Sequence, residues 1–233
     1  MQIYGLNKLT LLDFPGHLAC TLFTGGCNFR CPFCYNTSLV LEPTKIEKIP
    51  IEEIFAFLRQ RKGRLEGICI TGGEPTLSTD LPEFISQLRT LGYLIKLDTN
   101  GSNPDMLSFL LQNHLLDYVA MDIKNSPQSY KKTVGISNLD QSVIDKSVEL
   151  LKSCGILYEF RTTVVAGLHT EEDFSSIGKW LAGDCAYYLQ SFQKHSDLVG
   201  ENSSDMSTFS QKEMEHFREV VLPWLPNTKL RGI

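Results

Sequence analysis

Three cysteines lie close together in the stretch GGCNFRCPFCYN, which runs from Gly25 to Asn36. Three residues separate Cys27 from Cys31, and two residues separate Cys31 from Cys34. This clustering indicates a metal centre, because thiolates are preferred ligands of zinc and of iron–sulfur clusters. Structural metal sites are closed by four protein ligands, whereas catalytic sites keep one coordination position open. Three cysteines without a fourth are therefore typical of a reactive centre.

Other metal or redox sites are compatible with part of this pattern. Structural zinc usually needs two Cys-x-x-Cys pairs, and the chain has one such pair. An electron-carrying iron–sulfur protein brings four cysteines, and a redox dithiol of Cys31 and Cys34 leaves Cys27 without a role. We favour a [4Fe–4S] cluster that three thiolates hold, with one iron open. The four other cysteines are expected to be buried hydrophobic residues: Cys20, Cys69, Cys154 and Cys185.

Charged and amide side chains form a second group of candidate residues, at the ends of predicted strands. They share one face on each of three successive strands: Lys96, Asp98 and Asn100; Asp122 and Lys124; Glu159 and Arg161. Strands covered by crossover helices are normally apolar on both faces. The pattern therefore predicts a polar lumen that holds a charged ligand. Salt bridges without any ligand are the alternative.

The strands that must position these residues are predicted from six apolar, β-rich runs. They cover residues 18–24, 67–71, 93–99, 117–124, 157–165 and 186–192. Helical periodicity lies between them, for example at Leu81, Phe84, Ile85 and Leu88. Capping patterns at Thr170 and Ser210 predict helix starts, and His169 is expected at the surface or in a cap. This alternation predicts parallel strands joined by crossover helices.

Six strand–helix units are too few for a closed eight-unit barrel. They are compatible with an open three-quarter barrel or with a doubly wound sheet, and the charged strand faces favour the barrel. We therefore predict an α/β fold, a partial (β/α)6 barrel, in a single domain over residues 1–233. The irregular stretch at about 25–50 is predicted to be the cluster-binding loop, because long irregular loops in compact domains are usually functional.

Composition limits the partners of this chain of 233 residues. It is 42% hydrophobic and 21% charged, with a formal net charge of -5 and a pI of about 5.6. No basic face is indicated, so a nucleic-acid partner is not expected. No apolar run approaches the length of a membrane span, and the N-terminal residues show no secretory signal pattern. The expected location is the cytoplasm, without a membrane partner.

The cysteine motif, with Phe33 directly before its last cysteine, resembles that of the radical S-adenosylmethionine (SAM) superfamily. The turn Gly72-Gly73-Glu74-Pro75 is similar to the GGE motif of that family. The resemblance implies that the backbone of this turn meets the methionine amino group of SAM. It also implies a cofactor-binding role for Asp98, Asn100, Asp122 and Lys124, which lie in LDTNG (97–101) and MDIK (121–124). Two roles are open for Lys124 and for Arg161 of the following strand: pairing with the carboxylate of the cofactor, or balancing Asp98 and Asp122.

Two stretches narrow the resemblance. The opening GLNKLTLLDFPGHLACTLFTGGCNFRCPFCYN and the closing TKLRGI are similar to short activating proteins of anaerobic ribonucleoside-triphosphate reductase, which are glycyl-radical-enzyme activases. Tyr35 stands where relatives commonly carry histidine. A C-terminal histidine near the cofactor has no clear counterpart, and Gln190, Gln193 and His195 occupy about that region.

The resemblance implies a reaction. A [4Fe–4S] cluster, reduced by flavodoxin or ferredoxin, would cleave SAM to methionine and a 5′-deoxyadenosyl radical. This radical would take a hydrogen atom from one glycine of anaerobic ribonucleotide reductase. Two alternatives remain: a radical SAM enzyme that acts on a small molecule or peptide, and a non-catalytic iron–sulfur module.

Overall fold

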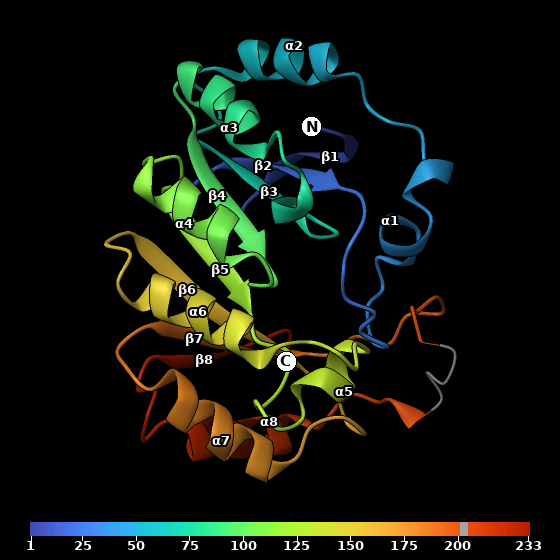
Figure 1. Cartoon of the computed structure of the whole chain (residues 1–233), viewed down its shortest axis with the longest axis vertical. Helices are drawn as coiled ribbons and strands as arrows, with labels where there is room; N and C mark the ends of the chain where they lie inside the picture. Colours follow the sequence, from blue (N-terminus) through green and yellow to red (C-terminus); the bar gives the residue numbers. More distant parts are fainter. Residues whose placement is uncertain (201–204) are drawn as a thin grey trace.

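A single eight-stranded sheet forms the centre of the molecule (Figure 1). The computed structural model describes residues 1–200 and 205–233. Sheet order follows chain order: β1 (Ile3–Thr10), β2 (Ala19–Thr24), β3 (Gly67–Gly72), β4 (Leu94–Thr99), β5 (Tyr118–Asp122), β6 (Leu157–Val164), β7 (Ala186–Ser191) and β8 (Thr228–Arg231). β1 is antiparallel to β2, and every later pair of neighbours is parallel.

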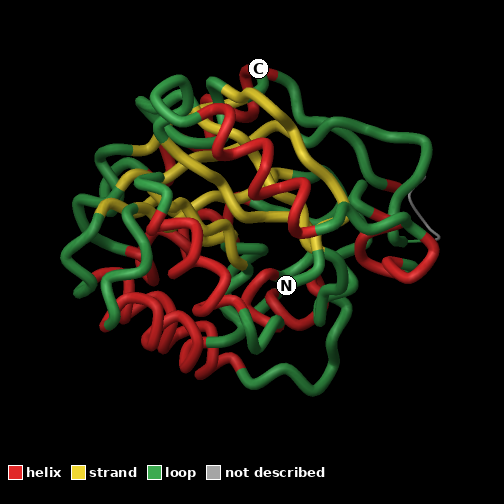
Figure 2. The backbone as a smooth tube through the Cα atoms, turned by 90° about the horizontal axis from the view of Figure 1, so that it is seen from above, coloured by secondary structure: helices red, strands yellow, loops and turns green. Residues whose placement is uncertain are grey.

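Most helices connect the parallel strands and lie on the outer side of the sheet (Figure 2), whereas α1 and α5 lie beyond the carboxyl ends of the strands (Figure 1). The helices are α1 (Thr37–Leu41), α2 (Ile51–Arg61), α3 (Leu81–Thr90), α4 (Pro104–Gln112), α5 (Tyr130–Val134), α6 (Gln141–Lys152), α7 (Glu171–Leu181) and α8 (Gln211–Val221), with 3-10 turns η1 (Pro43–Lys45) and η2 (Pro75–Leu77). Among the described residues, none of the helices is long and apolar enough to cross a membrane.

The predicted α/β partial barrel is confirmed, with two additional strands. The six predicted strands are β2 to β7, and the sheet runs on to β1 at one edge and β8 at the other without closing. The sequence does not predict β1 or β8, because edge strands are half exposed and lack a continuous apolar run. In β1, Asn7 and Lys8 interrupt the apolar pattern.

Local sequence signals account for the helix positions. Leu81, Phe84, Ile85 and Leu88 form the buried face of α3, as their spacing predicts. The side chain of Thr170 begins α7 with a complete capping box, and Ser210 begins α8 in the same way. Burying one leucine or phenylalanine side chain stabilises the fold by about 1.5–3 kcal/mol, so these stripes hold the helices on the sheet.

The loop predicted to bind a cluster follows β2 and contains two short helical segments, α1 and η1. Three parts of the chain hold its backbone in place. Gly26 N–H donates to Leu39 O at 2.7 Å, Arg30 N–H donates to Val134 O at 2.8 Å, and Val199 N–H donates to Cys34 O at 3.0 Å. The cysteines are therefore placed by α1, α5 and the segment after β7 together.

Candidate active site

A cavity of about 600 Å³ lies at the carboxyl ends of the strands, between the sheet and the cysteine loop (residues 25–36). Every predicted site residue lines it: Cys27, Cys31, Cys34, Gly72, Gly73, Glu74, Asp98, Asn100, Asp122, Lys124 and Arg161. Residues from Cys27 to Arg161 meet here because parallel strands all end at one edge of the sheet. The cavity is also lined by Tyr35, Gln190, Gln193 and His195.

The three thiols form one side of the cavity. Burial raises the pKa of the Cys27 thiol, and it raises that of Cys31 to about 12, although the nearby Lys124 ammonium opposes both shifts. Such thiols become thiolates only when a metal replaces the proton. In the described part of the chain, no three His, Cys, Asp or Glu side chains lie close enough together to bind one metal ion. An iron–sulfur cluster binds each cysteine through a different iron, and an all-thiol donor set suits it.

The Gly72-Gly73 turn lies directly against the start of the cysteine loop. Gly73 N–H donates to Thr24 O at 2.9 Å, and Glu74 N–H donates to Gly26 O at 2.7 Å. A Cβ at Gly73 would lie 1.9 Å from Gly26 O, and Gly72 has φ +119°. No side chain fits at either position, so the two glycines let backbone approach backbone.

The Glu74 carboxylate points into the wall of the cavity. Glu74 is only 1% exposed, and both oxygens of its carboxylate accept hydrogen bonds. Oε1 accepts from Thr99 Oγ1 at 2.8 Å and from the backbone and hydroxyl of Thr76, and Oε2 accepts from Asn100 N at 2.6 Å. Glu74 thus joins the Gly-Gly turn to the end of β4.

Five side chains form a charge ladder across the lumen, with signs that alternate: Lys96, Asp98, Arg161, Asp122 and Lys124. Arg161 Nη1 lies 3.1 Å from Asp98 Oδ2, and Arg161 Nε donates to Asp122 Oδ1 at 2.9 Å. Lys124 Nζ donates to Asp122 Oδ2 at 3.0 Å. Three cations face two carboxylates, so the ladder carries an excess of one positive charge.

The pKa values show how the ladder is stabilised. Burial opposes ionisation of Asp98 and Asp122, but the Arg161 guanidinium and the adjacent lysines outweigh it. The pKa of Asp98 is lowered, and that of Asp122 is lowered to about 2. Burial also opposes the charge on Lys124, and Asp122 and Cys31 raise its pKa in spite of it. Asp98, Asp122 and Lys124 are therefore charged at neutral pH, as a site for a zwitterionic ligand requires.

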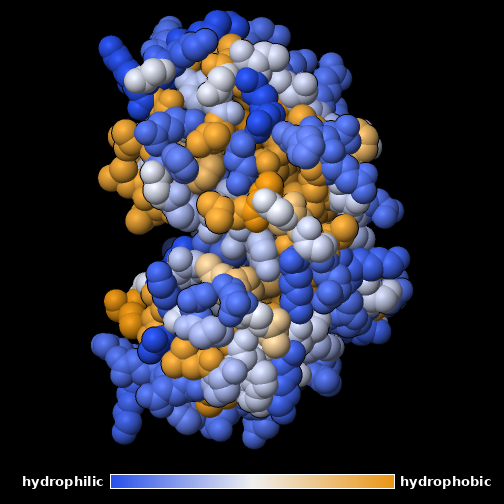
Figure 3. Space-filling view, turned by 90° about the vertical axis from the view of Figure 1, so that its left-hand side faces the viewer, coloured by the Kyte–Doolittle hydropathy of each residue, from blue (hydrophilic) through white to orange (hydrophobic). Residues whose placement is uncertain are grey.

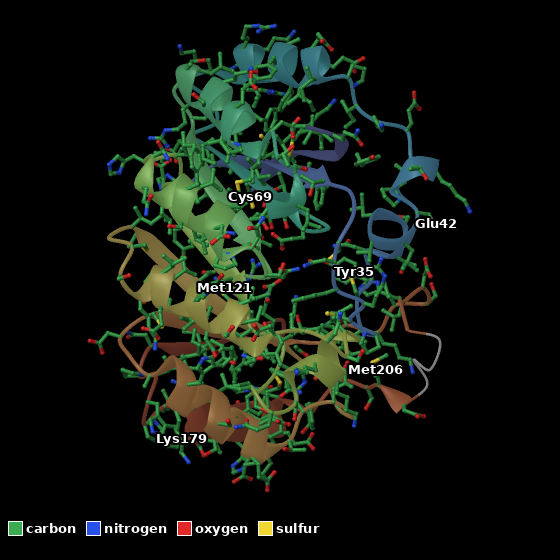
Figure 4. The ribbon with its side chains drawn as sticks, in the orientation of Figure 1. Tyr35, Glu42, Cys69, Met121, Lys179 and Met206 are labelled. Atoms are coloured by element: carbon green, nitrogen blue, oxygen red, sulfur yellow. The ribbon has the colours of Figure 1, made fainter. Side chains whose placement is uncertain are left out.

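Aromatic and amide side chains surround the entrance to the cavity. Asn100 Nδ2 donates to Asn28 Oδ1 at 3.0 Å, which joins the end of β4 to the cysteine loop. The Tyr35 and His195 rings lie 4.8 Å apart and both line the cavity. Figure 4 shows Tyr35 on the cysteine loop, across from the strand that carries Met121. The segment after β7 therefore reaches the site through His195, as its place in the sequence suggested.

A second charged network lies inside the barrel but outside the cavity lining. Arg231 Nη1 and Nη2 donate to the two oxygens of buried Glu159, each at 3.1 Å, and Tyr118 OH donates to Glu159 Oε2 at 2.9 Å. We call these three residues the Glu159 network. Glu159 and Arg161 are two residues apart and therefore lie on one face of β6, yet only Arg161 lines the cavity. Glu159 is instead neutralised by Arg231 of β8, a strand that the sequence does not predict.

His169 was expected at the surface or in a cap, and this expectation is wrong. The residue is buried, with its Nε2 2.9 Å from Lys124 O and its Nδ1 accepting from Val165 N at 3.1 Å. Burial lowers the pKa of this imidazole, so it is neutral at physiological pH. It supports the backbone beneath Lys124. A lone histidine ahead of a helix cap carries no local signal of such a position.

Comparisons with known proteins agree with this geometry. The sequence profile of the radical SAM superfamily matches residues 21–181. A Methanocaldococcus jannaschii protein, named as a candidate glycyl-radical enzyme activating enzyme, is 29% identical over 235 residues, which cover 99% of this chain and 96% of that protein.

Two solved structures share the fold. A domain of pyruvate-formate lyase-activating enzyme from Bacteroides vulgatus has a TM-score of 0.57 at 16% identity, covering 72% of this chain and 99% of its own. Streptococcus suis SuiB bound to S-adenosylmethionine has a TM-score of 0.67 at 14% identity, covering 91% of this chain and 52% of its own. At these identities the likeness shows the fold.

The profile match extends over more than half of the chain and includes the cysteine loop, the Gly-Gly turn and the charge ladder. Enzymes of this superfamily use a [4Fe–4S] cluster and SAM. The donor set described above fits both groups, with three thiols for iron and paired charges for a zwitterion. The chain therefore belongs to the radical SAM superfamily and is an enzyme of that kind.

Proposed function

We propose that this enzyme activates anaerobic ribonucleoside-triphosphate reductase by generating a glycyl radical on it. One observation supports the catalytic part of the proposal above all others. Three thiols, a side-chain-free backbone turn and a charge ladder line a single cavity. Separately, each feature has a structural explanation, but together they supply the contacts that a cluster and SAM need.

We assign the residues as follows. Cys27, Cys31 and Cys34 hold the cluster, and the backbone at Gly72 and Gly73 receives the methionine amino group of SAM. Lys124 would face the methionine carboxylate, because its charge acts on Cys31 and its side chain remains partly exposed. Asp98, Asp122 and Asn100 orient the ribose and amino groups, and Arg161 keeps both carboxylates ionised. When bound, the cluster and SAM supply a 5′-deoxyadenosyl radical that abstracts hydrogen.

The target rests on similarity. The relative from Methanocaldococcus jannaschii carries an activating-enzyme name and aligns over nearly its whole length. The stretch from Gly5 to Asn36 and the closing TKLRGI resemble reductase activating proteins in particular. A glycine in a protein must reach the cavity from outside, and an unclosed sheet leaves room for it. Flavodoxin or ferredoxin is the proposed reductant, and the cytoplasm is the proposed location.

Electron paramagnetic resonance tests both parts of the proposal. Anaerobically reconstituted, dithionite-reduced protein should give a [4Fe–4S] signal whose shape changes when SAM is added. Addition of the organism's anaerobic ribonucleoside-triphosphate reductase should then produce a glycyl radical signal, together with methionine and 5′-deoxyadenosine. A cluster signal that ignores SAM would contradict the catalytic assignment. SAM cleavage without a glycyl radical on the reductase would contradict the target alone.

A further inference from the structure

The carboxyl ends of β6 and β7 form a wall of the cavity that the proposed contacts with the cluster and SAM leave unused. Thr163 of β6 and Gln190 of β7 both line the cavity, and the two residues are paired in the register of these strands. Both residues are half-buried. Thr163 lies two positions after Arg161, so it shares the lumen face of β6 with the charge ladder. We call Thr163 and Gln190 the neutral pair.

The polar atoms of the neutral pair are available to a ligand. Across residues 1–200 and 205–233, no hydrogen bond joins the Thr163 hydroxyl or the Gln190 side-chain amide to another residue. Arg161, one layer closer to the amino end of β6, is instead bound by both Asp98 and Asp122. A hydroxyl and a primary amide can each both donate and accept hydrogen bonds. The neutral pair therefore offers donors and acceptors, without net charge, to a molecule in the cavity.

A glycine that is to lose a Cα hydrogen offers few groups for recognition. It has no side chain, so an enzyme can hold it only through its peptide N–H and C=O groups. These groups are neutral and include both a donor and an acceptor, which the neutral pair can match. The charge ladder, by contrast, suits the ammonium and carboxylate groups of SAM. The two regions of the lumen therefore differ in the same way as their proposed ligands.

A segment of another protein would reach the neutral pair from the carboxyl ends of the strands. On the amino side of the ladder, the lumen holds the Glu159 network, and Glu159 itself is 1% exposed. Figure 3 shows the face with the amino ends of the strands, and side chains fill its centre, with a notch at one side. At the mouth, Tyr35 is 62% exposed and its ring lies 4.8 Å from that of His195. The segment after β7 thus leads from the mouth, at His195, to Gln190 inside the cavity.

The backbone that carries the neutral pair is held in place by its neighbours. Phe192, two residues after Gln190, is 2% exposed. Its N–H donates to Val164 O at 3.3 Å, and its carbonyl oxygen accepts from Thr208 Oγ1 at 2.6 Å. The end of β7 is therefore fixed against β6 and against the segment before α8. A pair that is already positioned binds a ligand at a lower entropic cost.

We propose that Thr163 and Gln190 bind the main chain of the partner's glycine segment, by hydrogen bonds to peptide groups beside the reacting glycine. The proposal rests on the proposed function and adds a substrate subsite to it. Because Thr163 shares a strand face with Arg161, a chain bound to the pair lies next to the ladder, where SAM is proposed to bind. Hydrogen bonding to the ribose hydroxyls of SAM is the competing use of the pair, and the experiment separates the two.

The test uses two single variants of the reconstituted enzyme, Thr163→Val and Gln190→Leu, which remove the polar atoms and keep the approximate size of each side chain. Glycyl radical formation on the organism's anaerobic ribonucleoside-triphosphate reductase is followed by electron paramagnetic resonance at increasing reductase concentration. Each variant should raise the KM for the reductase about fivefold to tenfold, which corresponds to the loss of one hydrogen bond. The turnover number at saturating reductase should change less than KM, because these contacts hold ground state and transition state alike. The dissociation constant of SAM, measured by equilibrium dialysis without reductase, should match that of the wild type.

Two matched variants serve as controls. Thr163→Ser keeps the hydroxyl and should retain the wild-type KM for the reductase. Gln112→Leu makes the same exchange at an exposed glutamine of α4 and should match the wild type in every assay. Iron content, and urea denaturation of the cluster-free protein, show that each variant is folded.

Four results would overturn the proposal. An unchanged KM in both single variants, with the glycyl radical formed, would leave the pair to solvent alone. Weaker SAM binding with an unchanged KM for the reductase would assign the pair to the ribose of SAM. Equal increases of KM in Thr163→Ser and Thr163→Val would show an effect of packing, without a hydrogen bond from the hydroxyl. If wild-type enzyme cleaves SAM but forms no glycyl radical on the reductase, the proposed target is wrong, and this ligand of the pair is wrong with it.

Discussion

Two charged networks lie inside the same barrel and differ in what surrounds them. The charge ladder lines the cavity, stands beside the thiols and includes groups that remain partly exposed. The Glu159 network lies outside the lining, and its carboxylate is saturated by Arg231 and Tyr118. Arg231 also stacks on Tyr188, with 3.3 Å from its guanidinium carbon to the ring centre.

The difference shows that buried charge alone does not identify a binding site. Ion pairs inside a barrel also join strands, as Arg231 joins β8 to β6. A ligand site additionally needs open volume and charges that exceed their internal partners. The ladder has an excess cation and lines the cavity, whereas the Glu159 network is balanced and lies outside the lining. The predictions below test this distinction, from the largest expected effect to the smallest.

The largest effect is expected where the cavity meets the thiols. Replacing Cys31→Ser should abolish cluster binding and glycyl radical formation, because the proposed protein ligand set consists of three thiolates alone. Iron content and the electron paramagnetic resonance signal measure the loss. Cys154→Ser is the control, since Cys154 lies outside the cavity lining and should retain full iron content. Equal iron loss in both variants would contradict the site.

A pair of arginine variants separates the two networks. Arg161→Gln leaves Asp98 and Asp122 without their main counter-charge, and Arg231→Gln leaves Glu159 without its own. Each variant should lower the free energy of unfolding of the cluster-free protein by about 3–5 kcal/mol, the usual cost of an unpaired buried charge. Urea denaturation measures this loss. SAM binding to reconstituted enzyme should weaken more than about tenfold in Arg161→Gln only. Equal weakening in both variants would remove the distinction between the networks.

Glu74 tests whether a buried, hydrogen-bonded carboxylate beside the cavity acts by positioning the backbone of the Gly-Gly turn. In Glu74→Gln, an amide NH2 must face at least one of the donors that the carboxylate now accepts. The free energy of unfolding should fall by about 1–3 kcal/mol, the cost of an unsatisfied buried donor. SAM affinity should fall while iron content stays complete. The control is the exposed Glu66→Gln, and a variant that loses iron in parallel with SAM would contradict a purely positional role.

Acid titration should detect the contribution of the charge ladder to the free energy of unfolding. The pKa of Asp122 is about 2 in the folded protein against an ordinary value of 3.8, so the unfolded chain binds more protons between these values. The stabilising contribution is complete above about pH 4 and is lost as the pH falls through the folded pKa, which amounts to about 2 kcal/mol for Asp122. Urea denaturation of cluster-free protein from about pH 5 downward measures it. Asp122→Asn should show a shallower decline, and an identical decline would contradict this cause.

Much of the site can be predicted from the sequence, because its parts are local. Cys27, Cys31 and Cys34 lie within eight consecutive residues. The Gly72-Gly73 turn and the alternation of side chains along each strand are likewise formed by neighbours in the sequence. Chain order then predicts that the strand ends converge, since parallel strands finish at one edge. The structure places all of these residues around one cavity. Their roles toward a cluster and SAM remain predictions.

Other features depend on contacts between distant residues, which no local pattern records. In the sequence, Glu74 is an ordinary acidic residue in a turn. Its carboxylate becomes part of the cavity wall only because Thr99 and Asn100, at the end of β4, donate hydrogen bonds to it. The edge strands β1 and β8 pair on one side only, so their sequences are mixed in polarity. His169 becomes a buried support because its ring contacts the backbone of the segments that follow β5 and β6.

The sequence by itself thus determined the grouping of the three cysteines, the backbone turn, the six central strands and the faces on which charge lies. Periodicity and motif spacing suffice for these features because they involve neighbours along the chain. The tertiary structure decided which charges face the cavity and which neutralise one another, as Arg161 and Glu159 show on a single strand. That choice depends on which element packs opposite each side chain, and the partner of Glu159 comes from 72 residues further along the chain.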